Sequence, residues 1–212
     1  MAIELNTERM LLWKKYREIA NEEQINIWIV SGIEWKMGSG LDISLTITYY
    51  IMKIGLISDS HGHIHDDLEM YLSCCDEIWH AGDIGSIDTL KKLENFKKIR
   101  AVYGNIDDDL IRREIPESLF FTINKVKFFM THIAGSIPKY NPKTLKLIKE
   151  NKPDILICGH SHILKVVRDT TNDLLFINPG ACGKVGFHKK KTILRFDILE
   201  NKIDGLEVIE LS

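Results

Sequence analysis

The sequence predicts an α/β fold in which two β-sheets pack together and helices lie outside them. From residue 52 onward, short apolar runs alternate with amphipathic segments, and residues 164–211 hold only strand-like runs. Strands that alternate with helices and then continue alone indicate two packed sheets flanked by helices. Polar residues follow several of the apolar runs, and sites in open α/β sheets lie beyond the carboxyl ends of strands. We therefore expect these polar segments to meet at one edge of the fold.

Length, composition and charge are those of an ordinary globular protein. The chain has 212 residues, of which 44% are apolar and 27% are charged, and its formal net charge is -2. A chain of this length buries about 70% of its unfolded surface, which is enough for a core without disulfides. The small net charge gives no broad field that would attract nucleic acid or a membrane, although bound metals would still attract an anionic substrate.

The cysteines and the N-terminal residues indicate a cytoplasmic protein. Cys74, Cys75, Cys158 and Cys182 show no CxxC spacing, and we expect all four to be reduced. The first residues lack the basic and apolar stretches of a secretory signal. The apolar stretch at residues 41–57 is interrupted by charge and is too short to span a bilayer.

The chain divides at Met52, where we expect a domain of residues 52–212 to begin. The apolar run after Met52 ends in a polar loop, which is typical of a buried first strand. Residues 1–51 form an N-terminal extension without a motif, with weak signals for a helix at 11–20 and for strands at 26–30 and 43–50. Three interpretations of the extension stay open: an appendage packed on the domain or a partner, a poorly ordered segment, or a misassigned reading frame. Intact-mass analysis of the native protein separates the third from the others.

The first half of the domain is predicted to alternate strands and helices. Asp66 and Asp67 suit the first turn of a helix, where free N–H groups favour carboxylates. The predicted elements are strand 53–58, helix 66–74, strand 77–80, helix 87–95 and strand 99–103.

The second half is predicted to be mostly strands. Asn124-Lys125 reads as the turn of a hairpin, and Pro142 suits the first position of a helix because its φ is fixed near the helical value. The predicted elements are strands 119–123 and 126–131, helix 142–150, and strands 155–158, 164–168, 174–177, 192–198 and 206–211.

Five polar signatures at the ends of these runs carry the predicted chemistry. They are Asp59-Ser60-His61, Gly82-Asp83, Gly104-Asn105, Thr131-His132 and Gly159-His160-Ser161-His162. Seven of their side chains fit a site for two metal ions that share one carboxylate. One ion would be bound by Asp59, His61, Asp83 and His162, and the other by Asp83, Asn105, His132 and His160, with Asp83 as the bridge.

The ligand types and their spacing suit divalent cations. Asp59 and His61 are two residues apart, so an extended backbone would point both side chains the same way. Oxygen and imidazole ligands without thiolate suit Mn²⁺, Fe or Zn²⁺ and argue against a Cys-rich structural zinc site. Two metal ions ~3.5–4 Å apart can clamp a phosphate, and the water that bridges them becomes a hydroxide that attacks phosphorus in line with the leaving group.

These motifs give residues 52–212 a family resemblance. The chain resembles the calcineurin-like metallophosphoesterases, specifically the small bacterial and archaeal phosphodiesterases of the YfcE type. That family has DxH, GD, GN followed by His or Cys, TH and GHxH in this order, and the chain has each of them. Ile177-Asn178-Pro179-Gly180 is similar to the family's NPG segment, which helps to shape the edge of the site.

The resemblance implies the fold, the cofactors and the roles of the site residues. It implies a four-layer sandwich of two sheets between helices, and two divalent metal ions, Mn²⁺ before Ni²⁺, Fe or Zn²⁺. It also implies a phosphodiesterase that acts on a small-molecule phosphate ester. Asp83, Asn105 and His132 are the residues we assign to catalysis; Asp83 bridges the ions, and Asn105 also hydrogen-bonds a phosphate oxygen.

Two positions depart from the family pattern. Ile106 follows Asn105, where the larger phosphatases have a His that assists the leaving group. Isoleucine cannot donate a proton, and such assistance is worth about 10²–10⁴-fold. We therefore predict weak action on alkyl monoesters and better action on diesters or on esters with good leaving groups. Ile133-Ala134 follows His132, where a Gly is common, and is expected to alter the pocket wall rather than the metals.

The other histidines and an acidic run have plainer interpretations. His63 and His65 are expected in a loop near the mouth of the site, with substrate contact as the alternative. His80 is expected in the core, with orientation of a metal-bound histidine as the alternative. His188 stands beside three lysines and is expected to be solvated surface. The acidic run at 107–109 is expected to start a helix.

Two rival functions are weighed against the phosphodiesterase. A retromer subunit shares the fold and acts mainly as a protein-binding scaffold, but such scaffolds tend to lose metal ligands, and this chain keeps all seven. The run from His61 to Asp66 resembles the HxHxDH motif of metallo-β-lactamase-fold hydrolases, but its last two residues are reversed and Asp59 would be idle. We expect no membrane or nucleic-acid partner, and a homo-oligomer stays open.

Overall fold

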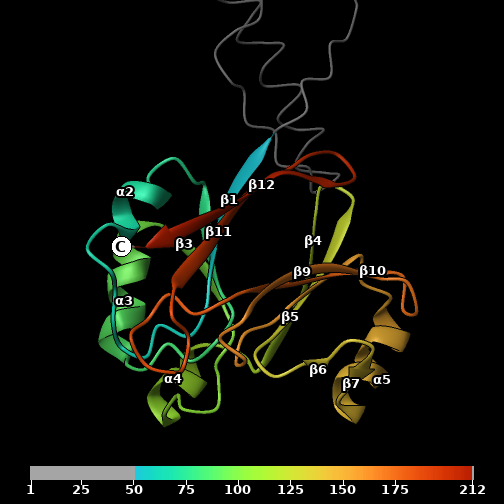
Figure 1. Ribbon diagram of the computed structural model, residues 1–212, viewed down its shortest axis with the longest axis horizontal. Coiled ribbons are helices and arrows are strands. Elements are labelled where there is room, and N and C mark those ends of the chain that lie inside the picture. The colour runs from blue at the N-terminus through green and yellow to red at the C-terminus, as the bar shows by residue number, and fades with distance from the viewer. Residues whose placement is uncertain (1–50, 212) are drawn as a thin grey trace, which may run out of the picture. The chain divides into compact units, whose positions relative to one another are not determined.

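Two five-stranded β-sheets form the centre of the structure, a computed structural model that describes residues 51–211 (Figure 1). Apart from Ile51, the expectations for the N-terminal extension concern residues 1–50 and lie outside the described residues. No helix within the described range is long and apolar enough to cross a membrane.

The first sheet has a parallel centre and an antiparallel edge. Its strands are β1 (Met52–Ile57), β2 (Glu77–His80), β3 (Lys98–Ala101), β11 (Lys191–Ile198) and β12 (Ile203–Leu211). They lie in the order β12-β11-β1-β2-β3. β1, β2 and β3 are parallel to one another, whereas β11 runs antiparallel to β1. The carboxyl ends of the three parallel strands therefore lie at one edge of the sheet, the edge predicted to hold the site.

The second sheet repeats this arrangement. Its strands are β4 (Ser118–Ile123), β5 (Val126–Thr131), β8 (Ile155–Ile157), β9 (Leu164–Asp169) and β10 (Leu174–Pro179), in the order β4-β5-β8-β10-β9. β5, β8 and β10 are parallel. The predicted hairpin turn is confirmed: β4 pairs antiparallel with β5, and Asn124 in the turn has a φ of 47°. A small hairpin of β6 (Gly135–Ser136) and β7 (Lys139–Tyr140) was not predicted.

Four short helices connect the strands within residues 51–211: α2 (Leu68–Leu72), α3 (Ile87–Phe96), α4 (Asp109–Glu114) and α5 (Pro142–Asn151). Side chains cap three of them, because Ser86, Asp108 and Asn141 accept hydrogen bonds from N–H groups in the first turns of α3, α4 and α5. The predicted helix start in the acidic run is thus confirmed, with Asp108 as the cap.

The first predicted helix is much shorter than expected. Asp66 and Asp67 lie before α2, and the Asp67 side chain makes no capping hydrogen bond. Instead, the Asp67 N–H donates to His65 Nδ1 at 3.2 Å. A side chain that bonds the neighbouring backbone competes with helix formation, which explains why the helix begins later than the acidic pair predicted.

Three apolar layers hold the sheets and helices together. Between the sheets, Trp79 of β2 packs edge-on against Phe128 of β5, with ring centroids 4.9 Å apart, within a cluster that takes residues from both sheets. Leu72 and Leu93 join α2 and α3 to the outer face of the first sheet. Ile148 joins α5 to the second sheet. Figure 1 shows α2 and α3 on one side of the sheets and α5 on the other, which confirms the four-layer α/β/β/α architecture.

Candidate metal centre

The loops after β1, β2, β3, β5 and β8 carry the predicted ligands to one edge of the two sheets. Backbone hydrogen bonds join these loops directly. The Asp59 N–H donates to the Gly82 carbonyl at 2.9 Å, and the Gly159 N–H donates to the His132 carbonyl at 3.0 Å. Residues that are distant in sequence therefore meet because parallel strands end side by side and their loops bond to each other.

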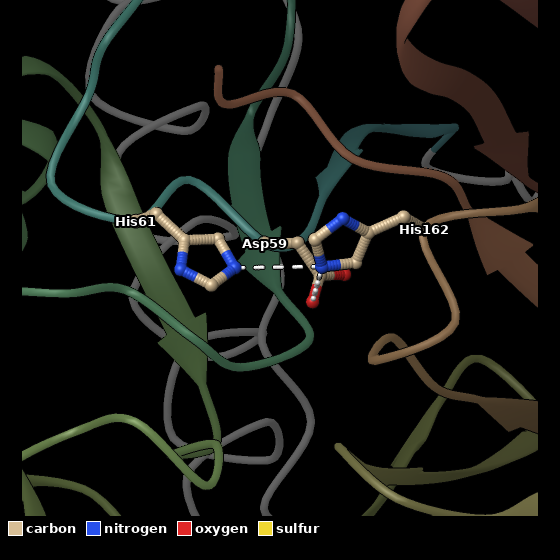
Figure 2. Close-up of side chains that lie close together, drawn as sticks. All are labelled: Asp59, His61 and His162. Atoms are coloured by element: carbon tan, nitrogen blue, oxygen red, sulfur yellow. Dashed lines mark hydrogen bonds and ion pairs between the residues drawn. The ribbon is translucent and has the colours of Figure 1, made fainter. Parts of the chain in front are cut away.

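Asp59, His61 and His162 form the first group of converging ligand atoms. One nitrogen or oxygen atom from each lies within 4.8 Å of the other two. His162 Nε2 is 3.2 Å from Asp59 Oδ1 and 3.4 Å from His61 Nε2. Figure 2 shows the two imidazoles pointing toward each other with the Asp59 carboxylate beside them. Asp59 is fully buried, so its carboxylate needs a positive partner inside the site.

Asp83, His132 and His160 form the second group, again with ligand atoms within 4.8 Å of one another. His132 Nε2 is 3.2 Å from Asp83 Oδ1 and 3.2 Å from Asn105 Oδ1. The other ring nitrogen, His132 Nδ1, lies 2.8 Å from the Ala81 carbonyl. Because a carbonyl only accepts, Nδ1 donates to it, and Nε2 is the ring nitrogen that faces Asp83 and Asn105.

Asp83 lies between the two groups. Its Oδ1 is 3.2 Å from His132 in the second group, and its Oδ2 is 3.7 Å from His61 in the first group. The Ile106 N–H donates to Oδ1 at 3.1 Å and holds the carboxylate in this orientation. The two oxygens of one buried carboxylate thus face two different sets of imidazoles.

The chemistry of the donors fits divalent cations. None of the ion pairs in the described part of the chain gives Asp59 or Asp83 a Lys or Arg partner; their charged neighbours are histidines. Burial raises the pKa of Asp59, against the opposing effects of Ser58 and His132. For Asp83, burial also acts to raise the pKa, but the hydrogen bond and charge of His132 outweigh it and lower the pKa. Buried carboxylates and imidazoles without a Lys or Arg partner are suited to hold metal ions.

The backbone at the ligands differs from the prediction of an extended Asp59–His61 segment. Asp59 and His61 have φ values of 55° and 48°, so that expectation is wrong. The chain turns sharply here because the N–H groups of His61 and Gly62 donate to the Asp83 and Ile84 carbonyls at 3.0 and 2.7 Å. Left-handed backbone at a non-glycine residue is uncommon and clusters at functional sites.

Two glycines allow the close approach of the site loops. A Cβ at Gly104 would lie 2.0 Å from Asp83 Oδ1, and a Cβ at Gly159 would lie 2.0 Å from Ser58 Oγ. A side chain at Gly104 would displace the Asp83 carboxylate, and one at Gly159 would displace the Ser58 hydroxyl beside Asp59, as expected where the backbone must approach the site closely.

Asp107 is a site-supporting residue that the sequence did not distinguish from its neighbours. Its buried carboxylate accepts from the Gly85 N–H at Oδ1 and from the Gly104 N–H at Oδ2, both at 2.7 Å. It thereby ties the loop that follows Asp83 to the loop that carries Asn105. Three consecutive aspartates gave no signal for which one turns inward.

His80 is confirmed as a core residue. It is fully buried, and burial lowers its pKa to about 3, so it is neutral. Its Nδ1 accepts from the Gly82 N–H at 3.2 Å, so its Nε2 carries the hydrogen and donates to Ser60 Oγ at 2.8 Å. His80 therefore links the loop of Asp59 to the loop of Asp83.

The remaining histidines separate into two cases. His63 and His65 lie outside both ligand groups, and their rings are 6.2 Å apart. His61 instead groups with Asp59 and His162, so the histidines at 61, 63 and 65 do not form one cluster, which weighs against the metallo-β-lactamase-like alternative.

His188 is not solvated surface, contrary to expectation: its side chain is partly buried, and its Nδ1 lies 3.3 Å from His162 Nδ1. The loop at 183–190 folds back over the site, which its lysine-rich sequence did not indicate.

A hollow of about 360 Å³ opens beside His160. Its walls are mainly apolar and include Ile133, Ala134 and Phe176; that Ile133-Ala134 alters a substrate pocket stays a prediction. Asn178 also lines it, and its amide donates to the Gly159 carbonyl at 2.7 Å and to Ser161 Oγ at 3.1 Å. The NPG segment therefore supports the loop that presents His160 and His162.

A four-layer fold with two adjoining Asp/His groups at one edge is typical of metal-dependent hydrolases with paired cations. Residues 52–201 match the calcineurin-like phosphoesterase superfamily domain, and the chain belongs to this family. Membership supports a hydrolase that acts on phosphate esters.

Relatives and solved structures agree with the family. The chain is 31% identical over 148 residues to a phosphodiesterase of Methanocaldococcus jannaschii, a match that covers 62% of this chain and 84% of the relative. It is similar to the solved structure of an archaeal phosphodiesterase, with 27% identity and a TM-score of 0.57 over 76% of this chain and 100% of the other. The fold is also that of Vps29 from Chaetomium thermophilum, with 14% identity and a TM-score of 0.58 over 76% of this chain and 97% of the other.

Proposed function

We propose that this protein is a phosphodiesterase that uses two divalent metal ions held by seven side chains. The observation that carries the proposal is the position of Asp83, whose two oxygens face the two groups of imidazoles. A carboxylate in this position can bridge two cations. The first ion would be bound by Asp59, His61, Asp83 and His162, and the second by Asp83, Asn105, His132 and His160.

The residues around the cations would orient the substrate. Two bound ions, Mn²⁺ foremost, would polarise the phosphate and activate a water for attack. Asn105 Oδ1 is 3.2 Å from His132 Nε2, so the amide of this exposed side chain has its NH₂ group left to donate to a phosphate oxygen. His132 would keep its ligand nitrogen directed at the ion because Ala81 fixes the other ring nitrogen.

The surroundings of the site favour a diester over an alkyl monoester. Ile106 contributes only its backbone N–H, and its exposed side chain offers no proton to a departing alkoxide. The apolar hollow beside His160 would accept an uncharged ester group of the substrate. The substrate that fits both features is a small phosphate diester, or an ester whose leaving group needs no protonation.

The test is hydrolysis by metal-stripped protein after Mn²⁺ is added back. Bis-p-nitrophenyl phosphate and p-nitrophenyl phosphate should be compared in parallel, and we expect Mn²⁺-dependent cleavage of the diester with little monoester turnover. His160→Ala should abolish nearly all activity, whereas His65→Ala should retain it, because His65 lies outside both ligand groups. Loss with His65→Ala and retention with His160→Ala would instead support the cluster at residues 61–65.

The alternative from another class is a protein-interaction scaffold like the retromer subunit. The scaffold function stays the alternative because the chain is similar to Vps29 structures, although that similarity concerns the fold alone. Folded protein that cleaves neither ester with any added metal would move the scaffold to first place. We place the protein in the cytoplasm because all four cysteines are unpaired.

A further inference from the structure

We propose that His188 is a positioning residue that holds His162 in the tautomer required for metal binding, an inference that rests on the proposed metal site. A ligand histidine generally donates its second ring N–H to a partner that fixes the ring and raises its basicity. His132 has such a partner in the Ala81 carbonyl. His162 faces both the backbone of Val185 and the side chain of His188, and the structure assigns the fixing of its tautomer to His188.

The tautomer of His188 follows from its contact with the backbone. His188 Nε2 lies 3.0 Å from the Gly183 carbonyl. A carbonyl only accepts, so Nε2 carries the hydrogen. A neutral imidazole protonated there has its lone pair at Nδ1. His188 therefore presents an acceptor at the end of its ring that faces His162.

The tautomer of His162 follows in turn. Its Nδ1 lies 3.3 Å from His188 Nδ1, and only one of the two can carry the hydrogen of this bond. Because His188 Nδ1 accepts, His162 Nδ1 donates. The lone pair of His162 is then at Nε2, the atom 3.2 Å from Asp59 Oδ1 and 3.4 Å from His61 Nε2. The atom freed for a metal ion is thus the one that faces the other ligands of the first group.

The backbone anchors this chain of hydrogen bonds at its far end. The Gly183 N–H donates to the Asp59 carbonyl at 3.1 Å, while the Gly183 carbonyl accepts from His188. The hydrogen bonds run from the Asp59 backbone through Gly183 and His188 to Nδ1 of His162, whose Nε2 lies 3.2 Å from the Asp59 carboxylate. This chain of bonds restrains His162 against rotation out of the site.

Gly186 provides independent support. Its φ of 127° disfavours any other residue, and a Cβ at this position would lie 2.2 Å from His162 Nδ1 and 3.0 Å from His188 Nδ1. The absence of a side chain at residue 186 is therefore a condition for the two rings to meet. The loop is shaped around the contact between the two histidines.

The first measurement is Mn²⁺ binding by calorimetry to the metal-stripped full chain. His188→Ala and His188→Phe should weaken binding at one of the two sites by about 10–100-fold, the usual effect of losing such a partner. His188→Asn should restore much of the affinity, because its amide oxygen supplies an acceptor near the position of Nδ1. Phe187→Ala is the matched control in the same loop and should bind as the wild type does, since Phe187 is fully exposed.

The second measurement reads the tautomer without any metal. Long-range ¹H–¹⁵N correlation spectra of the metal-free protein should show His162 with its hydrogen on Nδ1, and His188→Ala should shift it toward Nε2, the tautomer that a free imidazole favours. Unchanged Mn²⁺ affinity in His188→Phe, or a wild-type His162 that carries its hydrogen on Nε2, would overturn the inference. Wild-type protein that binds no Mn²⁺ would instead contradict the proposed function, while the spectra would still decide the role of His188.

Discussion

Ile106 occupies the position where one side chain could change which esters the site hydrolyses. Its side chain is 44% exposed, and its structural contribution is the backbone N–H bonded to Asp83. A new side chain there would stand next to Asn105 without disturbing the core. A substitution at Ile106 should therefore change substrate preference and leave the predicted metal ligands in place.

Ile106→His should raise kcat/KM for alkyl monoesters by about 10–100-fold, because general acid assistance is worth about 10²–10⁴-fold where it operates fully. Steady-state kinetics on an alkyl phosphate and on the diester measure the change. Ile106→Leu is the control and should leave both rates as they are. Equal monoester rates for the His and Leu variants would show that the leaving group departs without help from this position.

Glu77 is a buried charge whose protonation should affect stability. Its carboxylate accepts from Arg100 Nε at 2.6 Å and from Trp79 Nε1 at 3.0 Å, and it pairs with Lys98 at 2.6 Å. Burial acts to raise the pKa of Glu77, but these partners outweigh it and lower the pKa. A lowered pKa in the folded state contributes stability above the unfolded-state pKa, and this is lost as the pH falls through the folded-state pKa.

Glu77→Gln should therefore lower the free energy of unfolding at pH 7 by about 1–3 kcal/mol, the range for hydrogen bonds to charged groups. The difference from the wild type should shrink below the unfolded-state pKa of Glu, near 4, and vanish once the wild-type carboxyl is protonated. Urea unfolding at a series of pH values measures it. A difference that stays constant down to pH 3 would contradict the assignment.

The sequence predicted which side chains gather at the site better than it predicted what supports them. Asp59, His61, Asp83, His132 and His160 could be selected because each belongs to an ordered motif at the end of a strand. Their roles as ligands stay a prediction, although the structure brings them into two groups. The contacts of Asp107 and the role proposed for His188 depend on the paths of two loops, and no local pattern encodes such a path.

Strands and helix ends were predictable wherever a local signal was strong. β2 and β5 have the predicted bounds, and α5 begins at Pro142 as expected. Prediction from the local sequence pattern failed where a contact in the folded chain competed with the helix or strand propensity of the residues. Helix α2 begins at Leu68 rather than at Asp66 because the Asp67 backbone bonds His65, and the β6–β7 hairpin is too short to leave a periodic pattern.

The link between the loops after β2 and β3 can be tested with adjacent aspartates. Asp107→Asn should lower the free energy of unfolding by about 1–3 kcal/mol, because an amide cannot accept both N–H groups that the carboxylate holds. Asp109→Asn is the matched control at an exposed position and should stay within about 0.5 kcal/mol of the wild type. Urea unfolding measures both variants. An equal loss of unfolding free energy in both would show that the hydrogen bonds of Asp107 do not stabilise the fold.

At the scale of the whole molecule, metal binding should stabilise the fold. A ligand at 100 times its dissociation constant adds about 2.7 kcal/mol to the free energy of unfolding. For a chain of this size we expect Mn²⁺ to raise Tm by about 5–10 °C. Differential scanning calorimetry with and without a chelator measures the shift. His160→Ala, which removes an exposed predicted ligand, should show a clearly smaller shift.

The division of the chain at Met52 stays a prediction. The family match begins at residue 52, and all seven predicted ligands follow it. The sequence placed the boundary there because the first buried strand opens at that point. For residues 1–51 it offered only weak signals, for a helix at 11–20 and for strands at 26–30 and 43–50.

The left-handed backbone at the ligands has a consequence for how this protein can evolve. Five of the eight non-glycine residues with positive φ in the described chain are predicted ligands: Asp59, His61, Asp83, His160 and His162. Each such conformation costs about 1–3 kcal/mol, so together they consume an amount comparable to the whole net stability of a typical domain. Glycine at any of these positions would relieve strain and remove a predicted ligand at once. Substitutions that stabilise the backbone at these five positions would therefore remove the side chains proposed to bind metal, and only selection for activity would retain them.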